Sequence, residues 1–248
     1  NLLLAYDIFS QIDDKNKLTG EFKKIFTDSI FLHGQFIFNH LEYKEGLTGN
    51  HYLFNLAGLL FVSSYLSGND TIKQWQTFSM KEIEKEIEKQ FFDDGGNFEG
   101  STTYHCLSSE MVIYSIALML RNNYSFSQAL TNKIGKSAYF IHSILKPTGE
   151  VPQFGDNDSG RFFKLSYLEQ NDDENLLNYE GLVSAYSAIS SNNSFINYKT
   201  NYPLESTIIS HLANGKNLPF NNFQAPQLKI SPAKKELTYS KQHEILFD

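Results

Sequence analysis

Apolar residues recur at helical spacing along most of the chain. Between residues 71 and 92, for example, Ile72, Trp75, Ile83 and Ile87 fall largely on one stripe, which is typical of a helix with one buried face. The same spacing predicts helices at 1–10, 20–43, 51–66, 71–92, 108–122, 127–145, 174–190 and 203–213. Because helix follows helix with little strand between, the sequence predicts an all-α fold.

Two stretches depart from this pattern. Residues 149–165 are rich in Gly and Asp, which predicts a loop or short strands. After about residue 222 the tail contains Pro226, Pro232 and alternating apolar residues, which indicates the approach to a β region. Paired antiparallel helices of this length suit a bundle, a solenoid or an (α/α) toroid, and periodicity does not choose among them.

Composition excludes several classes of protein. The chain has 248 residues, of which 41% are hydrophobic and 15% aromatic, and a disordered tail would be poor in aromatic residues. A net charge of −7 argues against a nucleic-acid-binding protein. Apolar runs such as 59–62 are too short to span a membrane. A single cysteine excludes an intrachain disulfide and a cysteine-rich zinc site.

Three polar, glycine-containing segments carry the candidate chemistry: 49–52, 93–105 and 151–161. Each lies at a predicted helix end, where free backbone N–H groups can hold an anion. Each also has a simpler structural explanation. Asn50, or a hydroxyl residue at 101–103, could cap a helix, and residues 156–160 could form a turn stabilised by Asp and Asn side chains. An EF-hand is rejected, because its sixth and twelfth positions would be Arg161 and Tyr167 rather than Gly and Glu.

Together, the Asn, His, Tyr and Arg residues of these segments suit β-elimination on a uronic acid sugar. In that reaction a base removes the C5 proton beside the C6 carboxylate, and the bond to the C4 oxygen breaks. The carboxylate must be neutralised, which an Asn amide, a protonated His or an Arg can do. Tyr or His can serve as the base or as the acid that protonates the leaving oxygen. The reaction requires no metal and no cofactor.

Three stretches carry a resemblance to a known family: 49–61 (GNHYLFNLAGLLF), 94–105 (DGGNFEGSTTYH) and 149–163 (GEVPQFGDNDSGRFF). In order and spacing they resemble the helical domain of the heparinase II/III-like polysaccharide lyases, over most of residues 1–215. The resemblance implies an incomplete (α/α) toroid followed by an antiparallel β-sandwich domain, with the active site in the cleft between them. It also implies an anionic, uronate-containing polysaccharide as substrate and a periplasmic or secreted location.

The resemblance further implies roles for individual residues. Asn50 and His51 fall at the family's Asn–His pair, which neutralises the uronate carboxylate. Tyr104 falls at the catalytic tyrosine, which acts as the acid and is a candidate for the base. Among the remaining substrate-binding candidates, His105, Asn97 and Glu99 would line the same cleft. Asp156, Asp158 and Arg161 would be supporting or sugar-binding groups.

Two departures from the family pattern shape the expected organisation. Family members supply another catalytic histidine from the β domain, but the surroundings of His243 do not resemble that site, so we expect this histidine beyond Asp248. Family members also carry several helices before the Asn–His motif. We therefore expect a piece of a longer protein that is inactive by itself. Residues 1–222 would form a toroid domain that is truncated at its N-terminus. Residues 223–248 would form a linker and the start of the β-sandwich domain, which would be the partner of the toroid domain.

Two other functions stay open at this point. An (α/α)-barrel glycoside hydrolase would use two carboxylates among Asp94, Glu99, Asp156 and Asp158, about 5–5.5 Å apart if retaining or about 6.5–9.5 Å if inverting. A non-catalytic sugar-binding or surface-polysaccharide biosynthesis protein would keep the toroid but bind glycan without turnover.

Overall fold

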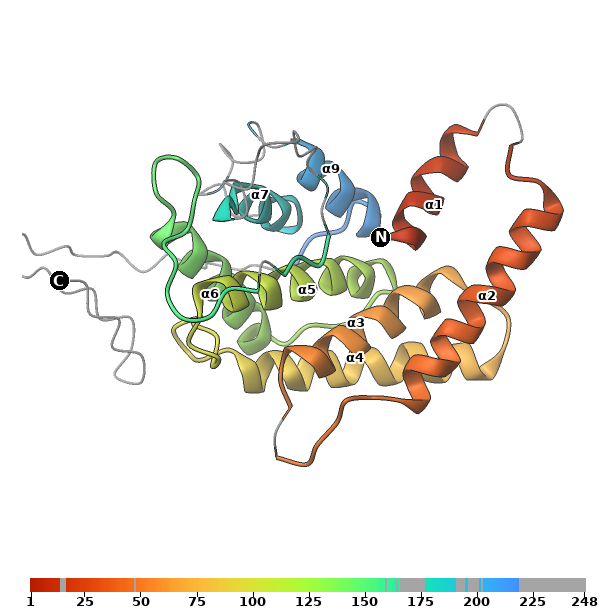
Figure 1. Ribbon diagram of the computed structural model, residues 1–248, viewed down its shortest axis with the longest axis horizontal. Helices are drawn as coiled ribbons and strands as arrows, with labels where there is room; N and C mark the ends of the chain where they lie inside the picture. Colours follow the sequence, from red (N-terminus) through yellow and green to blue (C-terminus); the bar gives the residue numbers. More distant parts are fainter. Residues whose placement is uncertain are drawn as a thin grey trace, which may run out of the picture. The chain divides into compact units, whose positions relative to one another are not determined.

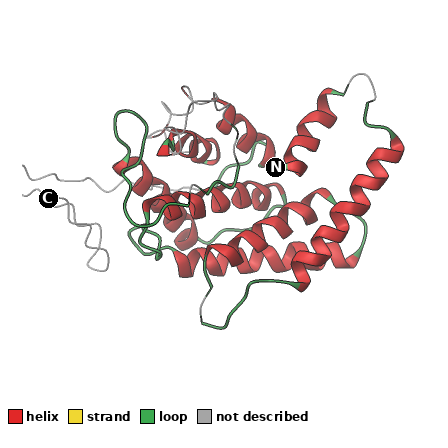
Figure 2. Ribbon diagram, viewed as in Figure 1, coloured by secondary structure: helices red, strands yellow, loops and turns green. Residues whose placement is uncertain are grey.

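A computed structural model of the chain describes residues 1–13, 17–46, 48–158, 160–163, 165, 177–190, 195, 201 and 203–218. Over these residues the protein consists of helices joined by loops, with two isolated β-bridges and no strand (Figure 2). The predicted all-α class is therefore confirmed. The β region predicted at 223–248 lies outside the described residues, and the toroid stays a prediction.

The described residues form eight helices (Figure 1). Their bounds are α1 (Leu2–Ile12), α2 (Gly20–Asn39), α3 (Asn50–Tyr65), α4 (Asp70–Gln90), α5 (Thr102–Arg121), α6 (Gln128–Ile144), α7 (Glu180–Ile189) and α9 (Pro203–Leu212). The prediction that the fifth helix begins at residue 108 is wrong, because it begins six residues earlier. Its true start carries the candidate site.

The chain divides into two compact units, Asn1–Glu84 and Lys85–Asp248, which are described separately. In the first unit α2 packs along α3, and a buried cluster of Ile30, Val62 and Trp75 lies at its core. Gly34 on α2 faces this cluster. A Cβ atom at Gly34 would lie 2.6 Å from Trp75 Cζ3 and 2.7 Å from Val62 Cγ1, so glycine allows α2 to approach this closely.

In the second unit, α5 contacts α6, α7 and α9, and α7 packs against α9. Every residue of α5 from Thr102 to Leu120 is buried except Tyr104. A helix that is buried on all sides is typical of the centre of a domain. The second unit is therefore built around α5, and Tyr104 is the one side chain in this stretch of the helix that reaches solvent. None of the described helices combines the length and apolar character needed to cross a membrane.

Candidate active site

Tyr104 lies in the first turn of α5, three residues after the residue that caps the helix. Ser101 adopts an extended backbone conformation, and its Oγ accepts a hydrogen bond from Tyr104 N at 3.3 Å. A serine in this position satisfies one of the N–H groups that a helix leaves free at its start. The cap fixes the backbone of Tyr104, so the helix start determines where its side chain begins.

A loop from distant sequence is bound to this helix start through Thr102. The Thr102 hydroxyl donates to Pro152 O at 2.7 Å and accepts from Phe154 N at 3.1 Å. The backbone N–H of Thr102 also donates to Phe154 O at 3.0 Å. These bonds satisfy a helix N–H and polar groups of the loop at once, so they order the loop over the start of α5.

The two hydroxyls on either side of Thr102 extend the same attachment. Ser101 Oγ and Thr103 Oγ1 both donate to Asp156 O, each at 2.6 Å. Gly155 has a positive φ of 69°, and a Cβ atom there would lie 3.0 Å from Ser101 Cα. Glycine is thus required for the loop to turn this close to the helix. We call Ser101, Thr102 and Thr103 the hydroxyl clasp.

The clasp brings Asp158 to the side chain of Tyr104. Tyr104 Oη donates a hydrogen bond to Asp158 Oδ2. This bond, together with partial burial and the negative charges of Asp158, Glu99 and Asp156, raises the pKa of Tyr104 to about 12. The phenol therefore keeps its proton at neutral pH, which suits an acid and disfavours a base.

The loop before α5 places three further candidates. Asn97 is buried, and its Oδ1 accepts from Glu99 N at 3.0 Å. Asp94 Oδ1 accepts from Gly96 N at 3.0 Å. Asp94 and Asn97 thus shape the turns of this loop, as Asp and Asn commonly do. Glu99 is half-buried and close enough to act electrostatically on Tyr104.

His105 follows Tyr104 but lies in the core. It is 2% exposed, with its ring 5.8 Å from that of Phe91 and 4.5 Å from that of Phe140, measured between centroids. Its Nε2 lies 3.2 Å from Ser137 O. This geometry gives His105 a packing role, and its predicted contact with sugar stays a prediction.

Arg161 is held in a largely buried ion pair. Its Nη1 lies 3.1 Å from Glu110 Oε1, its Nη2 donates to Asn178 O at 2.7 Å, and its guanidinium stacks 3.6 Å from the centroid of the Tyr179 ring. Glu110 Oε2 accepts from Phe162 N at 2.8 Å. These contacts commit Arg161 to holding residues 160–163 and 177–179 against α5, so its predicted role in sugar binding stays a prediction.

Sequence reasoning missed Glu110, although a signal for it existed. It is the one charged residue between Thr102 and Leu120, in a helix that is otherwise apolar or weakly polar. A buried carboxylate needs a cation and hydrogen-bond donors, and here Arg161 supplies the cation. Burial raises the pKa of Glu110 and outweighs the opposing effect of Arg161.

Asn50 and His51 belong to the first unit, at the start of α3. Asn50 is buried, whereas the His51 side chain is 74% exposed. His51 Nδ1 lies 3.0 Å from Glu42 Oε2, and Glu42 N donates to Asn55 Oδ1 at 2.7 Å. Asn55 thus holds Glu42 beside the helix, where its carboxylate orients the His51 ring. Nε2 of this exposed ring can meet a ligand from solvent.

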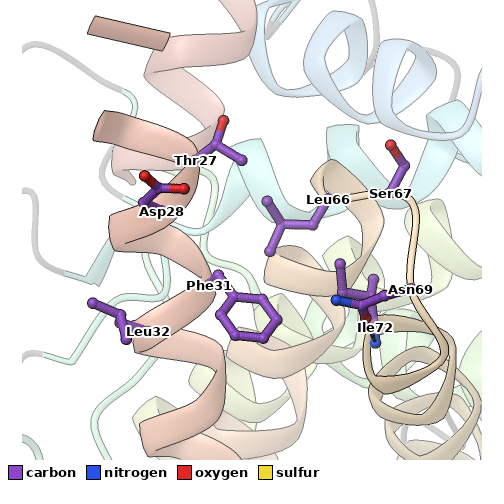
Figure 3. Close-up of a pocket in the computed structure, with 8 residues that line it drawn as sticks. All are labelled: Thr27, Asp28, Phe31, Leu32, Leu66, Ser67, Asn69 and Ile72. Carbon is purple, nitrogen blue, oxygen red and sulfur yellow. Dashed lines mark hydrogen bonds between the residues drawn. The ribbon is translucent and has the colours of Figure 1, made fainter. Parts of the chain in front are cut away.

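One pocket of about 370 Å³ lies in the first unit, between α2 and the turn that joins α3 to α4 (Figure 3). Phe31, Leu66 and Ile72 point toward it. It contains none of the predicted site residues. Among the described residues, no group of three or more His, Cys, Asp or Glu side chains is arranged to hold a metal ion.

Comparison with known proteins yields one family. The family model described as "Heparinase II/III N-terminus" matches residues 3–173, which include every candidate residue from Asn50 to Arg161. No solved structure matches the chain at a significant level.

Two curated relatives are named heparin-sulfate lyase. The protein from Pedobacter heparinus is 26% identical over 151 residues, which is 60% of this chain and 22% of the relative. The protein from Bacteroides stercoris is 26% identical over 171 residues, which is 67% of this chain and 23% of the relative. The match thus spans less than a quarter of the length of either relative.

Proposed function

The chain belongs to the heparinase II/III family, and from this premise we propose that it forms the tyrosine-bearing part of a polysaccharide lyase. The proposed reaction is β-elimination on a uronic-acid-containing glycan. The names of both relatives favour a substrate related to heparan sulfate. The proposal includes the domain organisation expected above, in which residues 1–222 are part of a toroid and a β domain follows.

One observation carries the proposal. Tyr104 is the residue of the buried stretch of α5 that reaches solvent, and its hydroxyl is fixed by Asp158. Tyrosines in domain cores are retained for packing, and such a tyrosine would be buried with its neighbours. A proton-bearing phenol presented from a rigid helix start is what general-acid catalysis requires.

The proposed β-elimination moves one proton to a base and one proton to the leaving oxygen. A base takes the C5 proton, the electrons of that C–H bond form the C4–C5 double bond, and the bond from C4 to its oxygen breaks. Tyr104 Oη gives its proton to the departing oxygen, and the resulting phenolate recovers a proton from water. The raised pKa of Tyr104, about 12, favours the acid role over the base role in this proposal. The base is then the further histidine that the family resemblance places beyond Asp248.

Asn50 and His51 have a separate task in this proposal. The Asn amide and the His ring stabilise the negative charge that develops on the C6 carboxylate when C5 loses its proton. Such stabilisation removes the largest barrier to taking a proton beside a carboxylate. Glu42 supports it by orienting the ring of His51.

The test uses the whole protein with a panel of heparan sulfate, chondroitin sulfate and alginate. Each elimination creates an unsaturated uronate, so we expect ultraviolet absorbance to rise with at least one substrate. Tyr104→Phe should lower the rate by roughly 10²- to 10⁴-fold, the usual contribution of a general acid. Tyr124→Phe, at a half-exposed tyrosine in the loop after α5, is the matched control and should keep the wild-type rate.

Two results would contradict the proposal. New reducing ends without absorbance would show hydrolysis, and would favour a carboxylate pair as the catalytic groups. Full lyase activity in Tyr104→Phe would remove Tyr104 from the reaction.

A further inference from the structure

Asp158 is held in place by the helix that carries Tyr104. Two residues earlier, the carbonyl oxygen of Asp156 accepts hydrogen bonds from the hydroxyls of Ser101 and Thr103 in the clasp, each at 2.6 Å. The clasp residues and Tyr104 are consecutive in sequence, so the loop and the phenol share one rigid support. The hydrogen bonds of the clasp therefore place Asp158 beside Tyr104, although 54 residues separate the two in the chain.

The hydrogen bond between Tyr104 and Asp158 also fixes the orientation of the phenol ring. The phenol O–H is the donor and the Asp158 carboxylate is the acceptor. A tyrosine side chain has two torsions, and the helix start fixes only its origin. A hydrogen bond at the far end of the ring selects one orientation, which is how a supporting residue preorganises a catalytic group.

We propose that Asp158 is a positioning residue that acts through Tyr104 and does not itself bind the sugar. It aims the phenol Oη and holds its proton on the tyrosine until the leaving oxygen replaces the carboxylate as acceptor. The inference rests on the proposed function. Of the two roles that the resemblance allows for Asp158, a supporting group or a sugar-binding group, it selects the first.

The charges around the phenol support this role. The groups that act on Tyr104 are Asp158, Glu99 and Asp156, all of them carboxylates. They disfavour the phenolate, so the proton stays on Tyr104 at rest, and a phenolate formed in turnover regains a proton readily. Loss of Asp158 should therefore lower the pKa of Tyr104 from about 12 toward its ordinary value of 10.0.

The first experiment is independent of activity. The protein is prepared with carbon-13 in its tyrosine rings, and the Tyr104 resonance is assigned by its absence in Tyr104→Phe. Titration should show Tyr104 ionising at lower pH in Asp158→Asn than in the wild type. Asn157→Ala, the neighbouring substitution, is the matched control and should leave the Tyr104 titration unchanged. An identical titration in Asp158→Asn and the wild type would overturn the inference.

The second experiment separates positioning from sugar binding. In the whole protein, Asp158→Asn should lower kcat by roughly 10- to 100-fold, as expected for a misplaced reacting group, with KM nearly unchanged. The alkaline limb of the pH–kcat profile should move to lower pH, and Asp158→Glu should recover part of the rate. A raised KM with unchanged kcat would overturn the inference and return Asp158 to sugar binding.

Failure of this inference differs from failure of the proposed function. If Tyr104→Phe abolishes lyase activity while Asp158→Asn behaves as the wild type, the function stands and the positioning role falls. If Tyr104→Phe keeps full activity, the proposed function falls, and the positioning role, which depends on it, falls with it.

Discussion

Removing the Glu110 side chain tests whether the buried ion pair with Arg161 holds the candidate site together. In Glu110→Ala, Arg161 loses its anion and the Phe162 N–H loses its acceptor. Arginine cannot shed its proton at accessible pH, so its charge stays in a site where the side chain is 17% exposed. Breaking one partner of a buried pair costs about 3–5 kcal/mol.

The structure favours the lower end of that range. Arg161 would keep its bond to Asn178 O and its stacking on Tyr179, so its guanidinium would not be wholly unpartnered. We therefore expect Glu110→Ala to lower the free energy of unfolding by about 3 kcal/mol. For a domain of this size, that corresponds to a fall in Tm of roughly 6–12 °C.

The measurement is urea denaturation followed by far-ultraviolet circular dichroism, with hydrogen exchange of α5 peptides as the local readout. Glu88→Ala, at an exposed glutamate on α4, is the control and should change the unfolding free energy by less than about 0.5 kcal/mol. Arg161→Ala and the double variant complete a cycle. Additive effects within about 0.5 kcal/mol would show that the two side chains do not interact energetically, and would refute the reasoning.

The remaining predictions concern pH and three glycines. Because burial raises the pKa of Glu110 above its ordinary value of 4.5, the folded state binds the Glu110 proton more tightly than the unfolded state does. The stability contributed by this proton is full below pH 4.5 and is lost as pH rises through the folded-state pKa, above which the contacts of the ionised pair remain. Glu110→Gln should flatten this dependence in urea titrations at several pH values. Gly34→Ala should cost about 1–3 kcal/mol by overpacking, with a shift in the fluorescence of Trp75, the single tryptophan; an unchanged midpoint would contradict the tight contact. Gly95→Ala should lower the Tm in a thermal melt, because φ at Gly95 is +97° and the new Cβ would lie 2.3 Å from the backbone of α6. Gly20→Ala, which has open space around it, is the control and should leave the Tm unchanged or raise it.

Periodicity predicted the helices well because their buried faces repeat at helical spacing. It placed the start of α5 at residue 108, six residues late. The alternative of a helix cap at 101–103 is confirmed by Ser101, and Thr102 and Thr103 belong to the first turn. Their hydroxyls bond to residues about 50 positions away, and no local pattern reveals such partners. Tertiary contacts therefore extend the helix backward and place Tyr104 in its first turn.

The candidate site was predictable to different degrees. Resemblance singled out Tyr104, whose catalytic role is a proposal, and the structure shows it as the partly exposed residue of a buried helix stretch. The same resemblance implied that His105 lines the cleft and that Arg161 is a supporting or sugar-binding group. The structure shows instead which contacts these side chains make: His105 is buried in the core and Arg161 pairs with Glu110. Sequence cannot show which way a side chain points when its partner lies on another element.

Product analysis tests the central claim most directly. The whole protein is incubated with heparan sulfate in water labelled with heavy oxygen, and the products are analysed by mass spectrometry. Our account predicts unsaturated uronates whose masses sum to that of the substrate, with no labelled oxygen gained on cleavage and with formation that depends on Tyr104. Saturated products that have gained labelled oxygen from water would show hydrolysis and would contradict the account.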